Sequence, residues 1–287
     1  MRFTERVAIK LKNTGPLIFT LRIIYYCGIH SKNILKVATE LVLLLPEFYR
    51  AYANNHRRRS DYKVRNLVDK LKKVSAWHSN FLGLIDFFKL DPEFNRLFER
   101  ASKTPGNHVM RCFMLYQLLQ QIGNLEGDVA EVGVYKGRSA KVIALTSGKF
   151  DKNVYLFDTF TGMPEVDPEK DNVYRKGDIS DTSLAEVQKF LSDCKNITIY
   201  PGFFPDTAEP VRVKRFSFVH VDVDIYRSVL DCCKFFYPRL VSKGMMVFDD
   251  PGFADCSGAK IAVDEFFSDK EEFPIHLATA QVLVVKH

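Results

Sequence analysis

The chain has 287 residues, of which 46% are hydrophobic and 26% are charged, fractions typical of a folded globular protein. They exclude collagen-like, low-complexity and wholly disordered chains. The net charge of +6 is unevenly distributed, because residues 1–77 hold 16 Lys and Arg against 5 Asp and Glu, a balance of +11, whereas the other 210 residues hold 25 against 30.

Residues 1–102 are predicted to form a basic helical extension. Apolar residues recur at helical spacing from Ile34 to Leu45 and again from Val64 to Val74. Arg22 interrupts the first apolar stretch, so we expect no signal peptide. The apolar run at 41–45 is far shorter than the ~20 residues of a spanning helix, so no transmembrane segment is predicted.

The cationic segment NNHRRRSDYK, residues 54–63, leaves two roles open. It could contact an anionic partner, either a membrane surface or a nucleic acid. Alternatively, the arm packs on the main domain or on a second subunit, giving a homo-oligomer, and turns its charges to water. We favour packing, and disfavour nucleic acid because no nucleic-acid-binding motif accompanies the charges. The turn sequence SKTPGN, residues 102–107, predicts that a second domain spans 103–287.

The six cysteines show no CxxC pair and no Cys/His spacing suited to zinc, which disfavours a disulfide scaffold. We therefore expect a protein of the reducing cytoplasm, with peripheral contact at the inner face of a membrane as the alternative.

Strand-like and helix-like segments alternate through the second domain. A helical pattern at 111–121 precedes the strand DVAEVGV, and further strands are predicted at NVYLFDTF, NITIYPG, RFSFVHVDVD, GMMVFDD and QVLVVK, with helices between most of them. This order predicts an α/β fold of Rossmann-like type, a mainly parallel sheet with helices on both faces. Ligands of such sheets bind beyond the carboxyl ends of the strands.

The turn AEVGVYKGRSA lacks the first glycine of the dinucleotide fingerprint, because Glu131 stands there, ahead of Gly133 and Gly137. A carboxylate would repel a pyrophosphate and suits the ammonium of an amino acid. Asp158, at the end of the next strand, has the position from which a carboxylate accepts bonds from ribose hydroxyls. An amino acid joined to a ribose indicates S-adenosylmethionine. The alternative is two ordinary tight turns with a capping acid.

Asp222, Asp249 and Asp250 follow two further predicted strands. Carboxylates at neighbouring strand ends supply the oxygen ligands that Mg²⁺ prefers. Alternatively, these aspartates cap loops or pair with Arg227 or Lys260. His220 falls on the same side of its strand as Asp222, where a histidine is more often packed and hydrogen-bonded than a base.

Six ordered segments, EVGVYKGRSA, FDTFTGMP, GFFPDT, HVDVDIY, FDDPG and GAKIAVDEFF, together resemble the macrocin O-methyltransferase family of class I S-adenosylmethionine-dependent methyltransferases. The resemblance spans about residues 127–267. It implies a seven-stranded sheet with a reversed last hairpin and a magnesium-dependent methyl transfer to a hydroxyl. The implied acceptor is a sugar, a polysaccharide or a natural-product glycoside.

Residue by residue, the resemblance implies these roles: Glu131, Gly133, Gly137 and Ser139 hold the methionine part, Asp158 the ribose, and Asp222, Asp249 and Asp250 the magnesium, with Asp222 also the candidate catalytic base. Phe203 replaces the tryptophan common in the family, and Pro251 and Gly252 stand where an aromatic often follows. We expect an enzyme. The alternative is a noncatalytic or membrane-anchoring protein with a methyltransferase-like domain, and an NAD-dependent oxidoreductase is disfavoured by the missing glycine.

Overall fold

The computed structural model describes residues 87–102 and 109–287, of which Phe87–His287 form one compact unit. Predictions for the basic arm up to residue 86, including those on leader, membrane contact and oligomerisation, lie outside the described residues. Among the helices of the described ranges, none is both long and apolar enough to cross a membrane.

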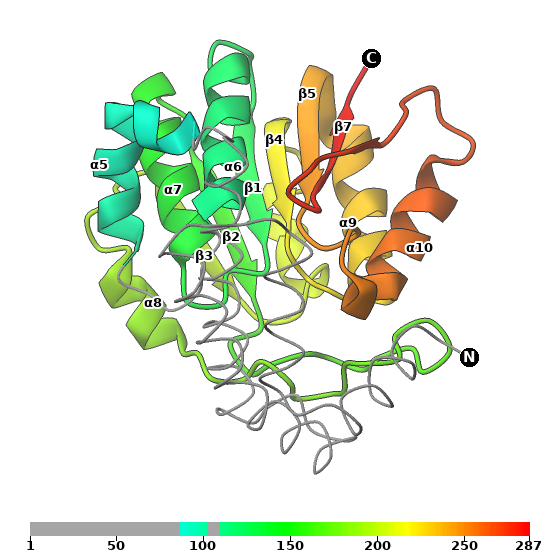
Figure 1. The fold of residues 1–287 in the computed structure, drawn as a ribbon. Helices are drawn as coiled ribbons and strands as arrows, with labels where there is room; N and C mark the ends of the chain where they lie inside the picture. The colour runs from blue at the N-terminus through cyan, green and yellow to red at the C-terminus, as the bar shows by residue number, and fades with distance from the viewer. Residues whose placement is uncertain (1–86, 103–108) are drawn as a thin grey trace, which may run out of the picture. The chain divides into compact units, whose positions relative to one another are not determined.

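Seven strands form one sheet in the order β3-β2-β1-β4-β5-β7-β6. Neighbouring strands from β3 to β5 are parallel, whereas β7 runs antiparallel to β5 and β6 antiparallel to β7. The predicted Rossmann-like sheet with its reversed last hairpin is therefore confirmed (Figure 1). The strands are β1 (Asp128–Val132), β2 (Val154–Asp158), β3 (Ile197–Pro201), β4 (Phe216–Val221), β5 (Leu240–Phe248), β6 (Ile275–His276) and β7 (Val282–Val285).

Helices cover both faces of this sheet (Figure 1). The cores on the two faces are built by strand alternation, since successive side chains point to opposite sides. Val129 in β1 packs with α6, α7 and α8, whereas its neighbour Ala130 packs with α9 and α10. The α-helices are α5 (Pro92–Ala101), α6 (Val109–Ile122), α7 (Arg138–Ser147), α8 (Leu184–Phe190), α9 (Tyr226–Phe236) and α10 (Ser257–Phe267).

Helix α5 belongs to the compact unit, although the sequence boundary near residue 102 assigns it to the extension. Asp91 caps its first turn by accepting from the N–H groups of Glu93 and Phe94. Phe94 is fully buried and packs edge-on against Phe113 of α6, with ring centroids 4.9 Å apart. An amphipathic helix of 10 residues gains most of its stability from such packing, so the described unit extends back to Phe87.

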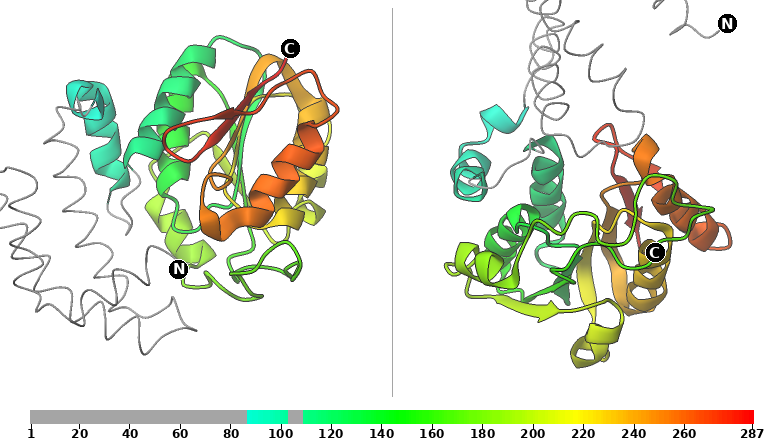
Figure 2. Two further views of the ribbon diagram at one scale, coloured as in Figure 1. Left: turned by 45° about the vertical axis from the view of Figure 1, so that its right-hand side comes forward. Right: turned by 90° about the horizontal axis from the view of Figure 1, so that it is seen from below.

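The strands β1, β2, β4 and β5 end at Val132, Asp158, Val221 and Phe248, along one edge of the sheet that is called the carboxyl edge below. The long loop between β2 and α8, residues 159–183, crosses beneath this edge, as the view from below shows (Figure 2). The middle of this loop is held to α9 by a hydrogen bond, which Asp171 accepts from the N–H of Tyr226 at the start of that helix.

Candidate functional site at the carboxyl edge

Two glycines shape the turn between β1 and α7. Gly133 has φ 90°, and a Cβ there would lie 1.8 Å from the carbonyl oxygen of Asp222, so a side chain is excluded where β1 and β4 end. Gly137 has φ 81° and is the N-cap of α7, an end that no side chain of the described residues caps. Ser139 lies partly exposed in the first turn of this helix. The free N–H groups of such a helix end favour an anionic group.

Asp158 ends β2, and its carboxylate holds this turn in place. Oδ2 accepts hydrogen bonds from the N–H groups of Val134, at 2.8 Å, and Tyr135, at 2.7 Å, while Oδ1 accepts from Phe160 at 2.7 Å. A carboxylate offers about four acceptor positions, so capacity remains for a hydroxyl. The structure thus adds a role in shaping the turn, and the ribose contact stays a prediction.

Four aspartates follow β4 and β5, and the structure divides them between two groups in which one ligand-capable atom of each member lies within 4.8 Å of the others. Asp249 and Asp250 are adjacent in sequence, in the bend that follows β5, but fall into different groups. Asp250 accepts a hydrogen bond from the N–H of Asp224 at 3.0 Å. The groups are His220, Asp222 and Asp249, and Asp224, Asp250 and Cys256. Of the three predicted metal ligands, two are therefore in one group.

These carboxylates are poorly compensated. Burial, followed by repulsion from Asp222, raises the pKa of Asp224 to about 7. Burial and the neighbouring Asp224 also raise the pKa of Asp250 well above its usual range. Arg111 of α6 forms an ion pair with Asp249, with both side chains largely buried. An oxygen-rich cluster with this excess of negative charge fits a hard divalent cation such as Mg²⁺.

The proposed alternative partners of the acids are engaged elsewhere. Arg227 pairs with Asp231 within α9, and Lys260 pairs with Asp264 within α10. Both pairs are i,i+4 contacts on a helix surface, so neither cation is committed to the aspartates of the carboxyl edge. The capping alternative holds in part, because Asp250 does accept from a loop N–H group.

Glu131 and His220 are fully buried and lie side by side on β1 and β4. Glu131 Oε1 is 2.9 Å from His220 Nδ1, and His220 Nε2 is 3.4 Å from Asp249 Oδ1. Burial raises the pKa of Glu131, and the contact with His220 opposes that shift. Glu131 Oε2 has no hydrogen-bond partner among the described residues, and the predicted contact of Glu131 with a ligand stays a prediction.

Sequence reasoning missed three residues of this site: Arg111, Gln281 and Tyr174. Gln281 Nε2 donates to Asp249 Oδ1 at 2.8 Å, and the Tyr174 hydroxyl, from the 159–183 loop, donates to Asp224 Oδ1 at 3.1 Å. Arg111 offered one signal, since it is the single charged residue in the sequence of α6, VMRCFMLYQLLQQI. A charge alone on an otherwise apolar helix calls for a buried partner.

The departures from the family pattern have a local structural explanation at Gly252. A Cβ there would lie 2.4 Å from the carbonyl oxygen of Ala280, so no aromatic residue fits at this position. The next residue, Phe253, is 40% exposed, and the guanidinium of Arg111 lies 4.9 Å from its ring centroid. An aromatic ring therefore does stand beside the acids, one position later. Phe203 is partly buried, and nothing in the structure explains its replacement of tryptophan.

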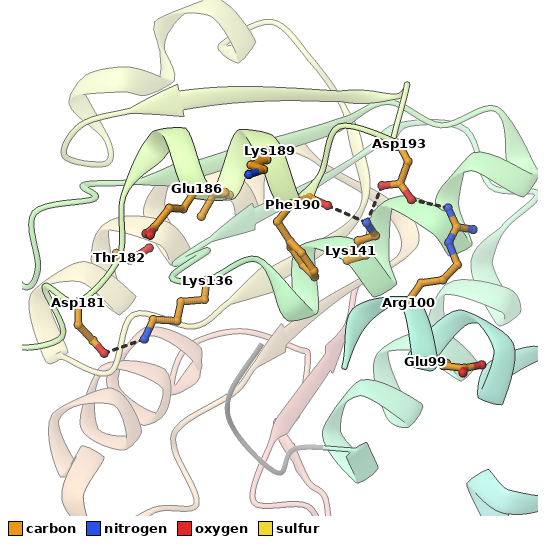
Figure 3. Close-up of a pocket in the computed structure, with 11 residues that line it drawn as sticks. Glu99, Arg100, Lys136, Lys141, Asp181, Thr182, Glu186, Lys189, Phe190 and Asp193 are labelled. Carbon is orange, nitrogen blue, oxygen red and sulfur yellow. Dashed lines mark hydrogen bonds and ion pairs between the residues drawn. The ribbon is translucent and has the colours of Figure 1, made fainter. Parts of the chain in front are cut away.

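A separate cavity of about 960 Å³ lies beside α5, α7 and α8 (Figure 3). Its basic side chains are largely paired with its acidic ones: Lys136 with Asp181 at 2.7 Å, and Arg100 and Lys141 with Asp193. The lining charges cancel and show no preference for an ion. None of the aspartates that follow β4 and β5 lines it, so we assign it no part in the chemistry. The charged lining residues are Arg100, Lys136, Lys141 and Lys189, and Glu99, Asp181, Glu186 and Asp193.

Comparisons with known proteins give a consistent result. A sequence model of the family described as Macrocin-O-methyltransferase (TylF) matches residues 108–279. Demethyldecarbamoylnovobiocin O-methyltransferase from Streptomyces niveus is 26% identical over 156 residues, which cover 50% of this chain and 59% of that protein. The 8-demethyl-8-(2,3-dimethoxy-alpha-L-rhamnosyl)-tetracenomycin-C 4'-O-methyltransferase from Streptomyces olivaceus is 26% identical over 146 residues, 46% of this chain and 56% of that protein. The match thus spans less than two thirds of either relative.

Solved structures share the fold. The O-methyltransferase NovP superposes with a TM-score of 0.55 at 24% identity, covering 67% of this chain and 87% of that one. The calicheamicin methyltransferase CalS11 superposes with a TM-score of 0.56 at 18% identity, covering 68% and 93%. At these identities the likeness supports the arrangement of the sheet and helices alone.

Proposed function

This chain belongs to the macrocin O-methyltransferase family, and from that premise we propose that it transfers the methyl group of S-adenosylmethionine to a hydroxyl of a sugar, polysaccharide or natural-product glycoside, assisted by Mg²⁺. One observation carries the proposal. The turn that would hold the methyl donor and the acids that would hold the acceptor meet at the contact between Gly133 and Asp222. Methyl transfer requires the acceptor oxygen about 3 Å from the methyl carbon, and this contact makes the two subsites adjacent.

The donor site is proposed along the turn after β1. Gly133 and Gly137 give the turn its positive φ angles, and the uncapped start of α7 with Ser139 would receive the carboxylate of the methionine part. Asp158 would accept from the ribose hydroxyls with the acceptor capacity left by its three backbone bonds. Bonds to Val134 and Tyr135 mean that Asp158 also fixes the turn that the donor contacts.

Asp222, Asp249 and Asp250 are proposed to hold the magnesium ion. The Asp222 and Asp249 carboxylates belong to one of the two groups and would bind the ion together. Asp250 belongs to the other group and would add a third carboxylate from there. When bound, the ion would lower the pKa of the acceptor hydroxyl and offset the negative charge that develops on its oxygen. Arg111, paired with Asp249, holds that carboxylate against repulsion from its neighbours.

Asp222 is the proposed base. Methyl transfer breaks the bond between the sulfonium sulfur and the methyl carbon while the acceptor oxygen bonds to that carbon, and the hydroxyl proton must leave to an acceptor. Asp222 directly follows β4, is partly exposed, and accepts no side-chain hydrogen bond within the described ranges, so its carboxylate is available for that proton. Tyr174, on the crossing loop, lies beside the same edge and would help exclude water.

The acceptor class rests on the relatives. One acts, by its name, on a rhamnosyl group of a tetracenomycin, and the other on demethyldecarbamoylnovobiocin. We propose a hydroxyl of a saccharide or of a glycosylated small molecule for this chain on that likeness.

The direct test is a transfer assay with radiolabelled S-adenosylmethionine and a panel of nucleotide-linked sugars and glycosides, with Mg²⁺ or with EDTA. We expect labelled product that depends on Mg²⁺ and is lost in Asp222→Asn. Asp264→Asn, on the surface of α10, is the matched control and should keep full activity. Full activity in EDTA would reject the metal, and failure of the wild-type chain to bind S-adenosylhomocysteine would reject the methyl donor.

For the basic arm we propose a packing role in a homo-oligomer, with contact to anionic lipid as the alternative. Light scattering on the full chain gives the subunit number. Sedimentation with anionic vesicles at low and physiological salt tests the alternative, because exposed charges are screened over about 8 Å at physiological ionic strength. Salt-sensitive vesicle binding by a monomer would favour lipid contact.

A further inference from the structure

Phe253 is an aromatic side chain that stays partly uncovered beside the acids of the carboxyl edge. Of the phenylalanines whose burial is described, only Phe253 and Phe273 are exposed, at 40% and 83%. Phe273 lies two residues before β6, which runs in the same direction as β5, so it belongs to the opposite edge of the sheet. Single exposed apolar residues are common on protein surfaces, so the argument for Phe253 depends on how it is held and on what it lies beside.

The turn that carries Phe253 is fixed by backbone hydrogen bonds. The N–H of Phe253 donates to the carbonyl oxygen of Asp250 at 2.9 Å, and the N–H of Cys256 donates to the carbonyl oxygen of Phe253 at 3.1 Å. The N–H of Gly252 donates to the carbonyl oxygen of Ala280 at 2.9 Å, and a Cβ on Gly252 would lie 2.4 Å from that oxygen. The turn therefore lies directly against the segment before β7. A ring on such a support is preorganised for a ligand contact.

Arg111 connects the ring to the proposed metal site. Its guanidinium carbon lies 4.9 Å from the ring centroid of Phe253, and its Nη1 pairs with Asp249 Oδ2. This cation–π contact covers one face of the ring. Because the side chain is still 40% exposed, its uncovered surface belongs to the rest of the ring. One side chain thus separates an accessible aromatic surface from a carboxylate proposed to hold the metal.

We propose that Phe253 is a specificity-determining residue for the acceptor, and that its ring stacks on the C–H face of the pyranose whose hydroxyl is methylated. The inference rests on the proposed function and deepens it, because it names the part of the acceptor that the protein recognises.

The chemistry of a pyranose suits this position. Its hydroxyls point outward around the ring, whereas its C–H groups form an apolar face with partial positive charge on the hydrogens. Such a face packs on an aromatic ring, whose own face is negative. Because only Arg111 separates Phe253 from Asp249, a sugar with one hydroxyl at the acids can turn its C–H face to the ring. An open-chain polyol offers hydroxyls to the acids but has no such face.

The rival role for Phe253 is structural. Its ring would shield the ion pair between Arg111 and Asp249 from water, which strengthens the attraction between the two charges. Leucine would shield the pair nearly as well, since it is apolar and reaches about as far, but it has no aromatic face. The two roles therefore differ in the effect that Phe253→Leu has on sugar binding.

The experiment measures sugar binding to the full chain by saturation-transfer NMR, with S-adenosylhomocysteine and Mg²⁺ present. The probes are the methyl pyranosides of rhamnose, glucose and galactose, and the open-chain polyol sorbitol is the comparison. We expect the wild type to saturate the C–H protons on one face of at least one pyranoside, and to bind sorbitol more weakly.

The variants separate stacking from shielding. The dissociation constant of the pyranoside should rise by about 3- to 10-fold in Phe253→Leu, because the aromatic face is lost. It should rise by about 10-fold or more in Phe253→Ala, which also loses apolar area. Phe253→Tyr keeps the ring and should stay within about 2-fold of the wild type. Phe273→Ala, the matched change at the opposite edge, should leave the dissociation constant unchanged.

Equal pyranoside affinity in Phe253→Leu and the wild type would overturn the inference and support the shielding role. It would also be overturned by a wild-type chain that binds S-adenosylhomocysteine but no pyranoside, or that binds sorbitol as tightly. If Phe253→Ala does not fold, the comparison of Phe253→Leu with Phe253→Tyr still decides, and S-adenosylhomocysteine affinity within about 3-fold of the wild type shows that each variant is folded. A wild-type chain that does not bind S-adenosylhomocysteine would reject the proposed function itself, which separates the two failures.

Discussion

Replacing Asp158 by alanine should weaken the binding of S-adenosylhomocysteine by at least about 30-fold. The carboxylate accepts three backbone hydrogen bonds, two of them from Val134 and Tyr135 in the turn that we propose to contact the donor. At about 1 kcal/mol for each bond, given that the freed N–H groups can turn to water, the two bonds of the turn amount to about 2 kcal/mol. That is about 30-fold in affinity, and loss of ribose contacts would add to it.

The third bond, to Phe160, brings the total to about 3 kcal/mol of unfolding free energy. For a unit of this size, about 1 kcal/mol shifts Tm by roughly 2 to 4 °C, so Asp158→Ala should lower Tm by roughly 6 to 12 °C. Calorimetric titration gives the affinity, and thermal unfolding without ligand gives the stability.

Asp128→Ala is the matched control. Asp128 begins β1 at the opposite edge of the sheet and accepts from the Tyr155 hydroxyl at 3.2 Å. Its loss should lower stability while leaving the affinity for S-adenosylhomocysteine within about 2-fold. If Asp158→Ala kept wild-type affinity, the assignment of Asp158 to the donor site would be refuted, and with it the link between the turn and binding.

Further changes test the other parts of the site. Gly133→Ala, whose Cβ would lie 1.8 Å from Asp222 O, should lower the free energy of unfolding in urea by on the order of 3 kcal/mol or more. Gly177→Ala, where φ is 83° but no atom lies near the added Cβ, should lower it by only about 1 to 2 kcal/mol. Equal losses would contradict the close approach of β1 and β4. Chelation should abolish methyl transfer while S-adenosylhomocysteine still binds by calorimetry, and Asp222→Asn should lower kcat by about 10² to 10⁴. Arg111→Met should destabilise the metal-free protein by about 3 to 5 kcal/mol, and Mg²⁺ should then raise Tm more than it does in the wild type; an unchanged Mg²⁺ effect would argue against shared charge compensation. The pKa of Asp224 is raised to about 7 and that of Asp250 is also raised, so the folded protein keeps protons that the unfolded chain releases above about pH 4. The Tm without metal should therefore fall as the pH rises from 5 to 8, and Mg²⁺ should flatten that dependence.

Much of this edge could be predicted from consecutive residues. Strand alternation places His220 and Asp222 on one side of β4, and the structure groups both with Asp249. The alternation of strands and helices predicted the sheet, which the structure confirms, and the polar residues that follow β4 and β5 lie together at its carboxyl edge, where ligands of such sheets bind. These features depend on short-range periodicity and on the rule that parallel strands end together, so they can be read without coordinates.

The partners of these residues could not be predicted in the same way. Arg111 reaches Asp249 across 138 positions of sequence, and Gln281 reaches it from the position just before β7, the second strand of the reversed hairpin. The division between Asp249 and Asp250, and the complete burial of Glu131, depend on which helix covers each face and how closely β1 approaches β4. Local sequence determined which side chains point to the same face of the sheet, because that follows from backbone geometry repeated every two residues. Tertiary packing alone decided which distant charges meet them, because desolvation and charge pairing depend on distances in space that no spacing along the chain encodes.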